Sequence, residues 1–295
     1  MPRMRRRPGW PPVPPFKAPP ARTLTIPNVG ELFLRDTGGS GPPVMLLHGW
    51  VASADLNWWG CYDDLRRAGY RVLAIDHRGH GRGLRTYEPF TLAACAADAA
   101  AAIEALECGP ATVVGYSMGG AIAQLLARDH PHALSGLVLS ATAQHWDDPR
   151  LRRYWRTMGP LGLVLSVAPR TSWRWALAYA GLRESPQTAW LLAEMVRHSA
   201  RDIAEAGREL GRFDSRPWLS ALKVPSAVVV TTEDEAVPPS KQREVAAALA
   251  ASVFEAPINH IEVASRPKRY NPALLEAIAA VREPEGARAD AVGYA

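Results

Sequence analysis

The hexapeptide Gly-Tyr-Ser-Met-Gly-Gly at residues 115–120 constrains the fold of this chain more than any other stretch. It follows an apolar, β-branched run at 111–114 and precedes an apolar run with helical spacing at 121–127. The sequence therefore predicts a strand, a sharp turn and a helix, with Ser117 in the turn. A turn this tight strains the backbone of the serine, and only glycines tolerate the crowding two residues on either side.

A serine placed in this way projects its hydroxyl above the sheet, where it can act as a nucleophile. The same turn points the backbone N–H of Met118 towards an oxygen of the molecule that Ser117 attacks. The Gly-x-Ser-x-Gly pattern also occurs in plain turns. Here the flanking strand and helix favour the catalytic interpretation.

Strand-like and helix-like runs alternate on both sides of Ser117. Apolar runs typical of strands lie at residues 23–27, 31–35, 44–47, 71–75, 111–114, 134–140, 226–230 and 253–255, the first two as a hairpin. Helical patterns lie at residues 57–68, 91–106, 121–127, 241–251 and 272–281. Repeated alternation implies right-handed crossovers, so we predict an α/β fold with one mostly parallel, eight-stranded sheet.

The alternation stops between residues 143 and 214, where helical stretches rich in aromatic residues replace the strands. We predict a helical cap at 143–214 that roofs an apolar pocket. The core then comprises 23–142 and 215–283, with a basic, proline-rich arm at 1–22 and a loose tail at 284–295. The candidate pocket residues are Val51, Tyr116, Trp146, Trp155, Trp173, Trp175 and Trp190. The alternative for most of these aromatic residues is packing of the cap onto the core.

The charge of the chain does not point to nucleic acid. There are 34 basic and 29 acidic residues. Six of the basic residues lie in the first 30 positions, which hold no acid, so 28 remain against 29 and the body is close to neutral. There is no base-reading motif. The arginines and prolines of residues 1–20 predict an extended, poorly packed arm; the alternative is a weak contact with an anionic membrane surface, anchored by Trp10.

No run of residues is long enough to span a bilayer, and prolines stand where a secretory signal has its apolar stretch. The three cysteines, Cys61, Cys95 and Cys108, show no metal-ligand spacing. We therefore predict a cytoplasmic protein that uses neither a metal ion nor another cofactor.

A serine hydroxyl needs a base to become nucleophilic, and the base needs an acid to hold it. The chain order Ser, acid, His places both partners after Ser117. His260 is the last histidine and lies in a loop after the last predicted strand, so it is the predicted base. Asp234 ends the strand at 226–230 and is the predicted acid. The alternative acids are Glu233, Glu235, Asp147 and Asp148.

Two loops after strands have predicted supporting roles. In hydrolases the loop that begins here with His48 supplies the second oxyanion donor, for which we predict the Trp50 N–H, with Val51 as the alternative. His48 itself is expected to support the loop by hydrogen bonding. The loop at 76–83 carries two histidines beside an aspartate, but its glycines favour a folded loop over a metal site. We expect Asp76 and Arg78 to hold the ends of that loop.

These motifs together resemble those of the α/β-hydrolase superfamily, in the group with a helical cap. The matching stretches are His48-Gly49-Trp50, residues 76–81, residues 115–120, residues 234–238 and Asn259-His260, over roughly residues 24–281. The resemblance implies Ser117 as nucleophile, Asp234 as acid, His260 as base, and the Trp50 and Met118 N–H groups as oxyanion donors. Two departures concern loop shape: Gly83 stands where many members have serine, and Asn259 where glycine is frequent.

We therefore predict a serine hydrolase that cleaves small, apolar carboxylic esters through an acyl-enzyme. Serine at residue 117 argues against haloalkane dehalogenases and epoxide hydrolases, relatives that use aspartate there. The same triad supports three alternatives: perhydrolysis of the haloperoxidase type, acyl transfer, and hydrolysis of a carbon–carbon bond. An alternative from another class is a ligand-binding protein that kept the fold without turnover.

Overall fold

The computed structural model describes residues 10–27 and 29–282. Eight strands form one sheet in the order β1-β2-β4-β3-β5-β6-β7-β8. The strands are β1 Ala21–Ile26, β2 Gly30–Asp36, β3 Pro43–Leu47, β4 Arg71–Ile75, β5 Ala111–Tyr116, β6 Leu134–Ser140, β7 Ser226–Thr231 and β8 Ser252–Ala256. β2 pairs antiparallel with β1 and with β4, and the other pairs are parallel. The predicted α/β fold with a mostly parallel, eight-stranded sheet is confirmed.

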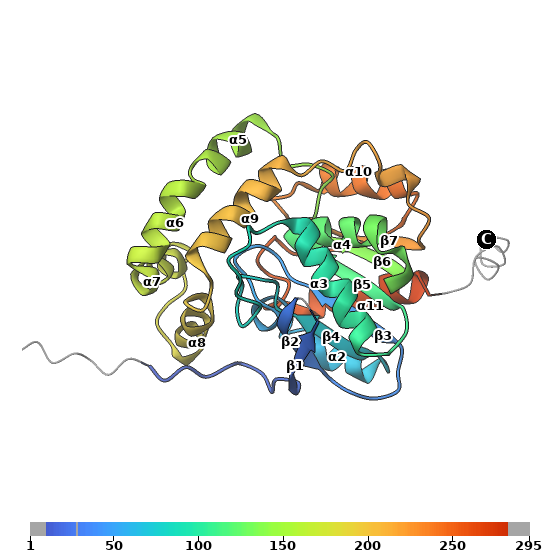
Figure 1. The fold of residues 1–295 in the computed structure, drawn as a ribbon, viewed down its shortest axis with the longest axis horizontal. Coiled ribbons are helices and arrows are strands. Elements are labelled where there is room, and N and C mark those ends of the chain that lie inside the picture. Colours follow the sequence, from blue (N-terminus) through green and yellow to red (C-terminus); the bar gives the residue numbers. More distant parts are fainter. Residues whose placement is uncertain (1–9, 28, 283–295) are drawn as a thin grey trace, which may run out of the picture.

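Helices cover both faces of the sheet (Figure 1). One face carries α3 Leu92–Ala105, α4 Met118–Asp129 and α10 Pro239–Leu249; the other carries α1 Ala54–Trp58, α2 Tyr62–Arg67 and α11 Pro267–Ala280. Short 3₁₀ helices lie at Pro131–Ala133 and Leu219–Ala221. Along β3, Met45 and Leu47 face the first layer, and Val44 and Leu46 face the second. Burial on both faces explains why the strands form continuous apolar runs in the sequence.

Five α-helices lie between β6 and β7: α5 Pro149–Arg156, α6 Met158–Val167, α7 Pro169–Tyr179, α8 Pro186–Met195 and α9 Ala200–Arg212. Residues 143–214 are named the helical insertion below. An isolated bridge joins His145 to Asp214, so both ends of the insertion meet at one place. α9 links the two parts, because its Leu210 packs in the main core while its Ile203 packs in a cluster of the insertion. None of the helices in the described residues is long and apolar enough to span a membrane.

Residues 10–20 form neither helix nor strand, and most of them are exposed. The ring of Phe16 lies among three aromatic rings, with centroids 6.3 Å from Trp59, 6.0 Å from Tyr62 and 5.7 Å from Trp190. Phe16 is thus a local contact of a mostly exposed segment, and the loose arm at 1–22 stays a prediction, with Ala21 and Arg22 already in β1. Residues 1–9 and the predicted tail at 284–295 lie outside the described residues.

Two helices differ from their predicted bounds. The single helix expected over 57–68 is divided near Gly60, whose carbonyl accepts a hydrogen bond from the Asn271 side chain at 2.8 Å. A Cβ at Gly60 would lie 2.3 Å from the Ala264 carbonyl oxygen, so the chain passes too close for a side chain. The last helix begins at Pro267 and not at residue 272, because proline is well suited to the first helical position.

Candidate active site

Ser117 occupies the sharp turn between β5 and α4, with φ of 55° and ψ of −117°. This conformation is costly for a residue with a side chain. The flanking glycines allow the backbone on the two sides of the turn to approach closely, because a Cβ at Gly115 would lie 2.4 Å from the Gly119 carbonyl oxygen. The Thr142 hydroxyl donates to the Ser117 carbonyl at 2.9 Å and helps to fix the turn. The strained serine predicted from the glycine spacing is therefore present.

Three side chains predicted from the sequence meet at the carboxyl edge of the sheet. His260 Nε2 lies 3.0 Å from Ser117 Oγ, and His260 Nδ1 lies 2.7 Å from Asp234 Oδ2. The three residues follow β5, β7 and β8, and parallel strands end at the same edge of a sheet. In this arrangement an imidazole can accept the serine proton while the carboxylate stabilises the resulting cation.

The Asp234 carboxylate is buried, with 3% of the residue exposed. Its Oδ1 accepts the N–H groups of Ala236 at 2.9 Å and Val237 at 2.8 Å, and its Oδ2 accepts the Thr231 hydroxyl at 2.9 Å. Gln242 donates in turn to Thr231 Oγ1 at 2.8 Å. These donors hold the carboxylate in one orientation. The supporting roles of Thr231 and Gln242 are not predicted from the sequence. The position of Thr231 at the end of β7 is the one feature that points to such a role.

The alternative acids lie elsewhere. Glu233 is 3.5 Å from Arg269 in an ion pair, and Glu235 is exposed. Asp147 and Asp148 form ion pairs with basic side chains away from the imidazole. Asp234 is therefore the acid that the geometry supports.

Tyr116 positions the imidazole through the main chain. Its hydroxyl donates to the His260 carbonyl at 2.8 Å, and its ring centroid lies 5.6 Å from the His260 ring. Tyr116 is only 2% exposed and packs edge-on against Trp58 and Tyr270. It is thus a buried support of the histidine loop, which differs from the pocket wall that the sequence predicts.

The loop after β3 lies against the serine, because a Cβ at Gly49 would be 3.4 Å from Ser117 Cβ. The Gly49 N–H donates to Asn57 Oδ1 at 3.0 Å, and the Gly49 carbonyl accepts from His48 Nδ1 at 2.8 Å. His48 Nε2 accepts the His77 N–H at 3.0 Å, so the imidazole is neutral with its proton on Nδ1. Burial lowers the pKa of His48 well below its ordinary value. His48 therefore supports the loop, as expected; Asn57 is a support that the sequence does not reveal.

The two predicted oxyanion donors flank the serine. Trp50 follows Gly49, and Met118 is the first residue of α4. Within residues 10–27 and 29–282, neither backbone N–H donates to a loop or side-chain acceptor. Paired N–H groups of this kind can stabilise a negative oxygen. Val51, the alternative donor, has φ of 54° and turns the loop away from β3.

Two tryptophans of the insertion border this loop. The Trp155 ring centroid lies 5.8 Å from that of Trp50, in an edge-on contact. Trp173 belongs to an apolar cluster that also includes Trp50 and Val51. These side chains give the site an apolar border on the insertion side.

The other predicted pocket tryptophans differ in their surroundings. Trp146 packs against Phe213, with a centroid distance of 5.7 Å, and Trp190 packs against Phe16. Trp175 is 74% exposed, so its assignment to an enclosed pocket is wrong. Helical spacing alone does not tell which side of α7 faces the core, since both sides carry tryptophan.

The loop at 76–83 is held at both ends, as expected. Asp76 accepts the N–H groups of Ala54 and Arg82, each at 2.7 Å. Arg78 pairs with Asp98 through two hydrogen bonds of 2.8 and 2.7 Å. In the described part of the chain, no group of three or more His, Cys, Asp or Glu side chains is arranged to hold a metal ion.

A buried cluster of four histidines includes two from this loop: His48, His77, His80 and His198. Ring centroids are 4.3 Å apart for His48 and His77, and 5.5 Å apart for His80 and His198. Burial lowers the pKa of each histidine, to about 3 for His77 and about 4 for His198. His198 Nδ1 accepts the Gly81 N–H at 2.9 Å, which joins the loop to the insertion. The cluster is therefore neutral and structural.

Comparison with known proteins agrees with this geometry. A family model described as alpha/beta hydrolase fold matches residues 42–159. The putative carbamate hydrolase RutD of Caulobacter sp. (strain K31) is 31% identical over 216 residues, which cover 70% of this chain and 80% of that protein. The crystal structure of the putative non-heme bromoperoxidase BpoC from Mycobacterium tuberculosis H37Rv has a TM-score of 0.71 at 26% identity, covering 85% of this chain and 97% of that one.

A further structure, that of the enol-lactonase from Burkholderia xenovorans LB400, has a TM-score of 0.70 at 24% identity and covers 88% of this chain and all of that one. At this identity the likeness bears on the fold. The family model, the RutD similarity and the sheet topology agree. The chain belongs to the alpha/beta hydrolase fold family.

Proposed function

We propose that the protein is a serine hydrolase that cleaves carboxylic esters through an acyl-enzyme intermediate. Ser117 is the nucleophile, His260 the general base and Asp234 the acid that orients it. The observation that carries the proposal is the unbroken hydrogen-bond path from Ser117 Oγ through the imidazole to the Asp234 carboxylate, with distances of 3.0 and 2.7 Å. Such a path is what a weakly nucleophilic hydroxyl needs.

In the first step Ser117 Oγ attacks the ester carbonyl carbon while His260 Nε2 takes the hydroxyl proton. The N–H groups of Trp50 and Met118 stabilise the negative carbonyl oxygen. His260 then gives its proton to the leaving alcohol, and the acyl group remains on Ser117 Oγ. In the second step His260 deprotonates a water molecule, which attacks the acyl-enzyme and releases the acid. No step requires a cofactor.

The surroundings of the serine support an apolar substrate. Trp155 and Trp173 border the loop that carries Trp50 and Val51. An aliphatic or aromatic acyl group would leave water for an apolar surrounding there, which is favourable. In this proposal residues 143–214 act as the cap of the site.

The three cysteines are unpaired, which supports a reducing compartment such as the cytoplasm.

Pre-steady-state hydrolysis of p-nitrophenyl esters tests the proposal. With acyl chains from two to eight carbons, the wild-type protein should release a burst of p-nitrophenol equal to the enzyme concentration, followed by slower turnover. Ser117→Ala and His260→Ala should abolish the burst. Absence of both burst and turnover with every chain length would contradict ester hydrolysis.

The similarity to a putative non-heme bromoperoxidase favours a second candidate. In that reaction hydrogen peroxide, in place of water, attacks the acyl-enzyme and yields a peracid. The two candidates share Ser117 and differ in the acceptor. Peracid formation that exceeds hydrolysis at millimolar peroxide would favour the second candidate. A carbamate substrate, suggested by the name of RutD, belongs in the same comparison.

A further inference from the structure

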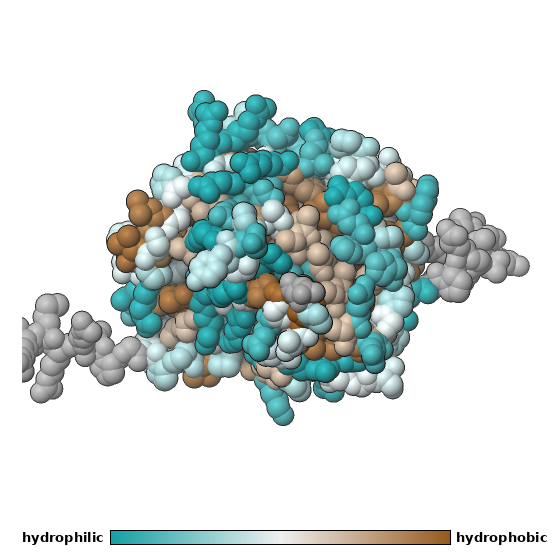
Figure 2. Space-filling view, viewed as in Figure 1, coloured by the Kyte–Doolittle hydropathy of each residue, from teal (hydrophilic) through white to brown (hydrophobic). Residues whose placement is uncertain are grey.

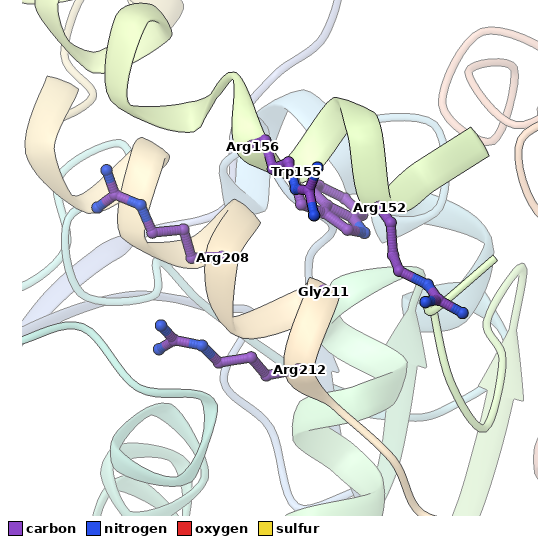
Figure 3. A pocket seen from close by; sticks show the side chains of 6 residues that line it. All are labelled: Arg152, Trp155, Arg156, Arg208, Gly211 and Arg212. Atoms are coloured by element: carbon purple, nitrogen blue, oxygen red, sulfur yellow. The ribbon is translucent and has the colours of Figure 1, made fainter. Parts of the chain in front are cut away.

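Four arginines line a groove on the helical insertion, between α5 and α9 (Figure 3). Its volume is about 300 Å³. The lining residues are Arg152, Trp155, Arg156, Arg208, Gly211 and Arg212. No acidic side chain is among them. None of the arginines belongs to the machinery proposed above, although Trp155 borders both the groove and the proposed site.

Two glycines of α9 allow α5 and α6 to lie close to it. A Cβ at Gly211 would be 2.5 Å from Trp155 Cδ1, so the indole packs directly on the helix backbone. One turn earlier, a Cβ at Gly207 would be 2.3 Å from Met158 Sδ. The indole is also tied to the chain, because its Nε1 donates to the Trp146 carbonyl at 3.0 Å. The groove therefore has a fixed aromatic side.

The arginine side chains come from both helices. Figure 3 shows Arg208 and Arg212 leaving α9 on the same side, one turn apart. Arg152 and Arg156 come from α5, and the Arg152 side chain points away from Arg208 and Arg212. Guanidinium groups present paired N–H donors that match the oxygens of phosphate. Neighbouring guanidinium groups, such as those of Arg208 and Arg212, can therefore donate to one phosphate-bearing group.

The positive charge of the groove is little compensated. Arg212 lies 3.4 Å from Glu209, but its side chain is 74% exposed, so the pair is weak. The Nε of Arg152 donates to the uncharged carbonyl of Asp147 at 2.8 Å. Among the described residues, the side chains of Arg156 and Arg208 have no ion-pair or hydrogen-bond partner. A concave surface with this charge concentrates anions.

We propose that this groove binds the phosphate-bearing end of a small molecule, held by the guanidinium groups of Arg156, Arg208 and Arg212. A concave site of this volume suits a small ligand better than it suits a flat membrane surface. The site also adjoins the active site, because the Trp155 ring that lines it contacts the Trp50 ring. Trp50 carries one of the proposed oxyanion donors.

Calorimetric titration of the full-length protein with sodium pyrophosphate, at constant ionic strength, tests this assignment. The wild-type protein should bind one pyrophosphate saturably. Arg156→Ala and Arg208→Ala should each weaken binding about tenfold, because each removes a charge-assisted hydrogen bond. The matched control is Arg153→Ala, an exposed arginine of α5 that does not line the groove, and it should change affinity less than twofold. Ser117→Ala should bind like the wild type.

Three results would overturn the assignment. The first is the absence of saturable binding to the wild-type protein. The second is equal weakening by Arg153→Ala and Arg208→Ala, which would indicate a diffuse positive field. The third is binding to vesicles containing an anionic phospholipid but not to pyrophosphate, which would make this face a membrane contact. Because binding is measured without turnover, the outcome does not depend on the proposed esterase activity.

Discussion

At the carboxyl edge of the sheet, charged side chains are buried and paired, whereas on the helical insertion arginines and apolar side chains face the solvent. In Figure 2 hydrophilic atoms gather over α5 and hydrophobic atoms over α6. Most of the large apolar side chains exposed in the described residues belong to the insertion: Tyr154, Leu163, Val164, Val167, Trp175, Tyr179 and Leu182. The sheet edge has few such side chains because its loops are folded inward around buried polar groups.

The difference has a physical meaning for the site. Buried ion pairs such as Arg78 with Asp98 hold the loops at the sheet edge in one arrangement. Surface pairs of the insertion, such as Arg174 with Glu184, constrain little because water competes for both groups. We infer that the sheet edge sets the chemistry and that the insertion sets which molecules reach it.

The largest expected effect is at the sheet edge. Asp234→Asn should lower kcat for ester hydrolysis by about 10⁴-fold, because the amide no longer stabilises the imidazolium and favours the wrong tautomer of His260. Steady-state kinetics measure this loss. The matched control is the adjacent Glu233→Gln, whose exposed side chain should leave kcat within about twofold. A loss below tenfold for Asp234→Asn would remove Asp234 from the triad.

We expect the loss of an ion pair to lower the free energy of unfolding more at the sheet edge than on the insertion. Arg78→Met leaves the Asp98 carboxylate buried without its partner and should lower the free energy of unfolding by about 3–5 kcal/mol. Arg174→Met removes an exposed pair of the insertion and should change it by less than about 1 kcal/mol. Urea denaturation of both variants measures the contrast. Equal effects would show that burial does not distinguish the regions.

The histidine cluster predicts acid sensitivity. His48, His77, His80 and His198 stay neutral when folded because burial lowers their pKa values, whereas in the unfolded chain they bind protons near pH 6.5. The unfolded state therefore gains protons first as pH falls below 6.5, and the free energy of unfolding decreases by about 1.4 kcal/mol per pH unit for each histidine. Asp76, whose pKa is raised to about 6, acts in the opposite sense.

Urea denaturation between pH 7 and pH 5 measures this slope. His80→Gln should reduce the slope by the share of one histidine, about 1 kcal/mol per pH unit averaged between pH 7 and pH 5. Equal slopes in the wild-type protein and His80→Gln would contradict a neutral, buried His80.

The smallest effect is expected on the surface of the insertion. Trp175→Ala should change the free energy of unfolding by less than about 0.5 kcal/mol and leave KM for esters unchanged, because the side chain is 74% exposed. Thermal denaturation and ester kinetics measure both quantities. A large rise in KM would restore Trp175 to the pocket.

Predictability from the sequence also differs between the two regions. The strands and the turn at Ser117 could be predicted, because strands buried on both faces are apolar throughout and because glycines reveal the turn. The catalytic roles of Ser117, Asp234 and His260 stay predictions. The supports Thr231 and Gln242 could not be predicted, since the contact of Thr231 with Asp234 and that of Gln242 with Thr231 arise only once the strands are assembled. The same holds for Asn57, which reaches Gly49 across a loop.

In the insertion, amphipathic spacing indicated helices but not the surroundings of each tryptophan. Trp173 and Trp175 lie two residues apart on α7, which places them on different sides of the helix, one buried and one exposed. The packing of Trp190 against Phe16 likewise depends on a distant segment, which the sequence shows only to be rich in proline. Such choices are made by tertiary contacts between separate elements.

The central claim is that His260 activates Ser117, and covalent labelling with a fluorophosphonate tests it most directly. Peptide mass spectrometry of the wild-type protein should find one adduct per chain, on the peptide that contains Ser117. His260→Ala should slow the labelling rate by about 10³-fold or more, because the hydroxyl then keeps its proton. An adduct on another residue, or an unchanged rate in His260→Ala, would contradict the account.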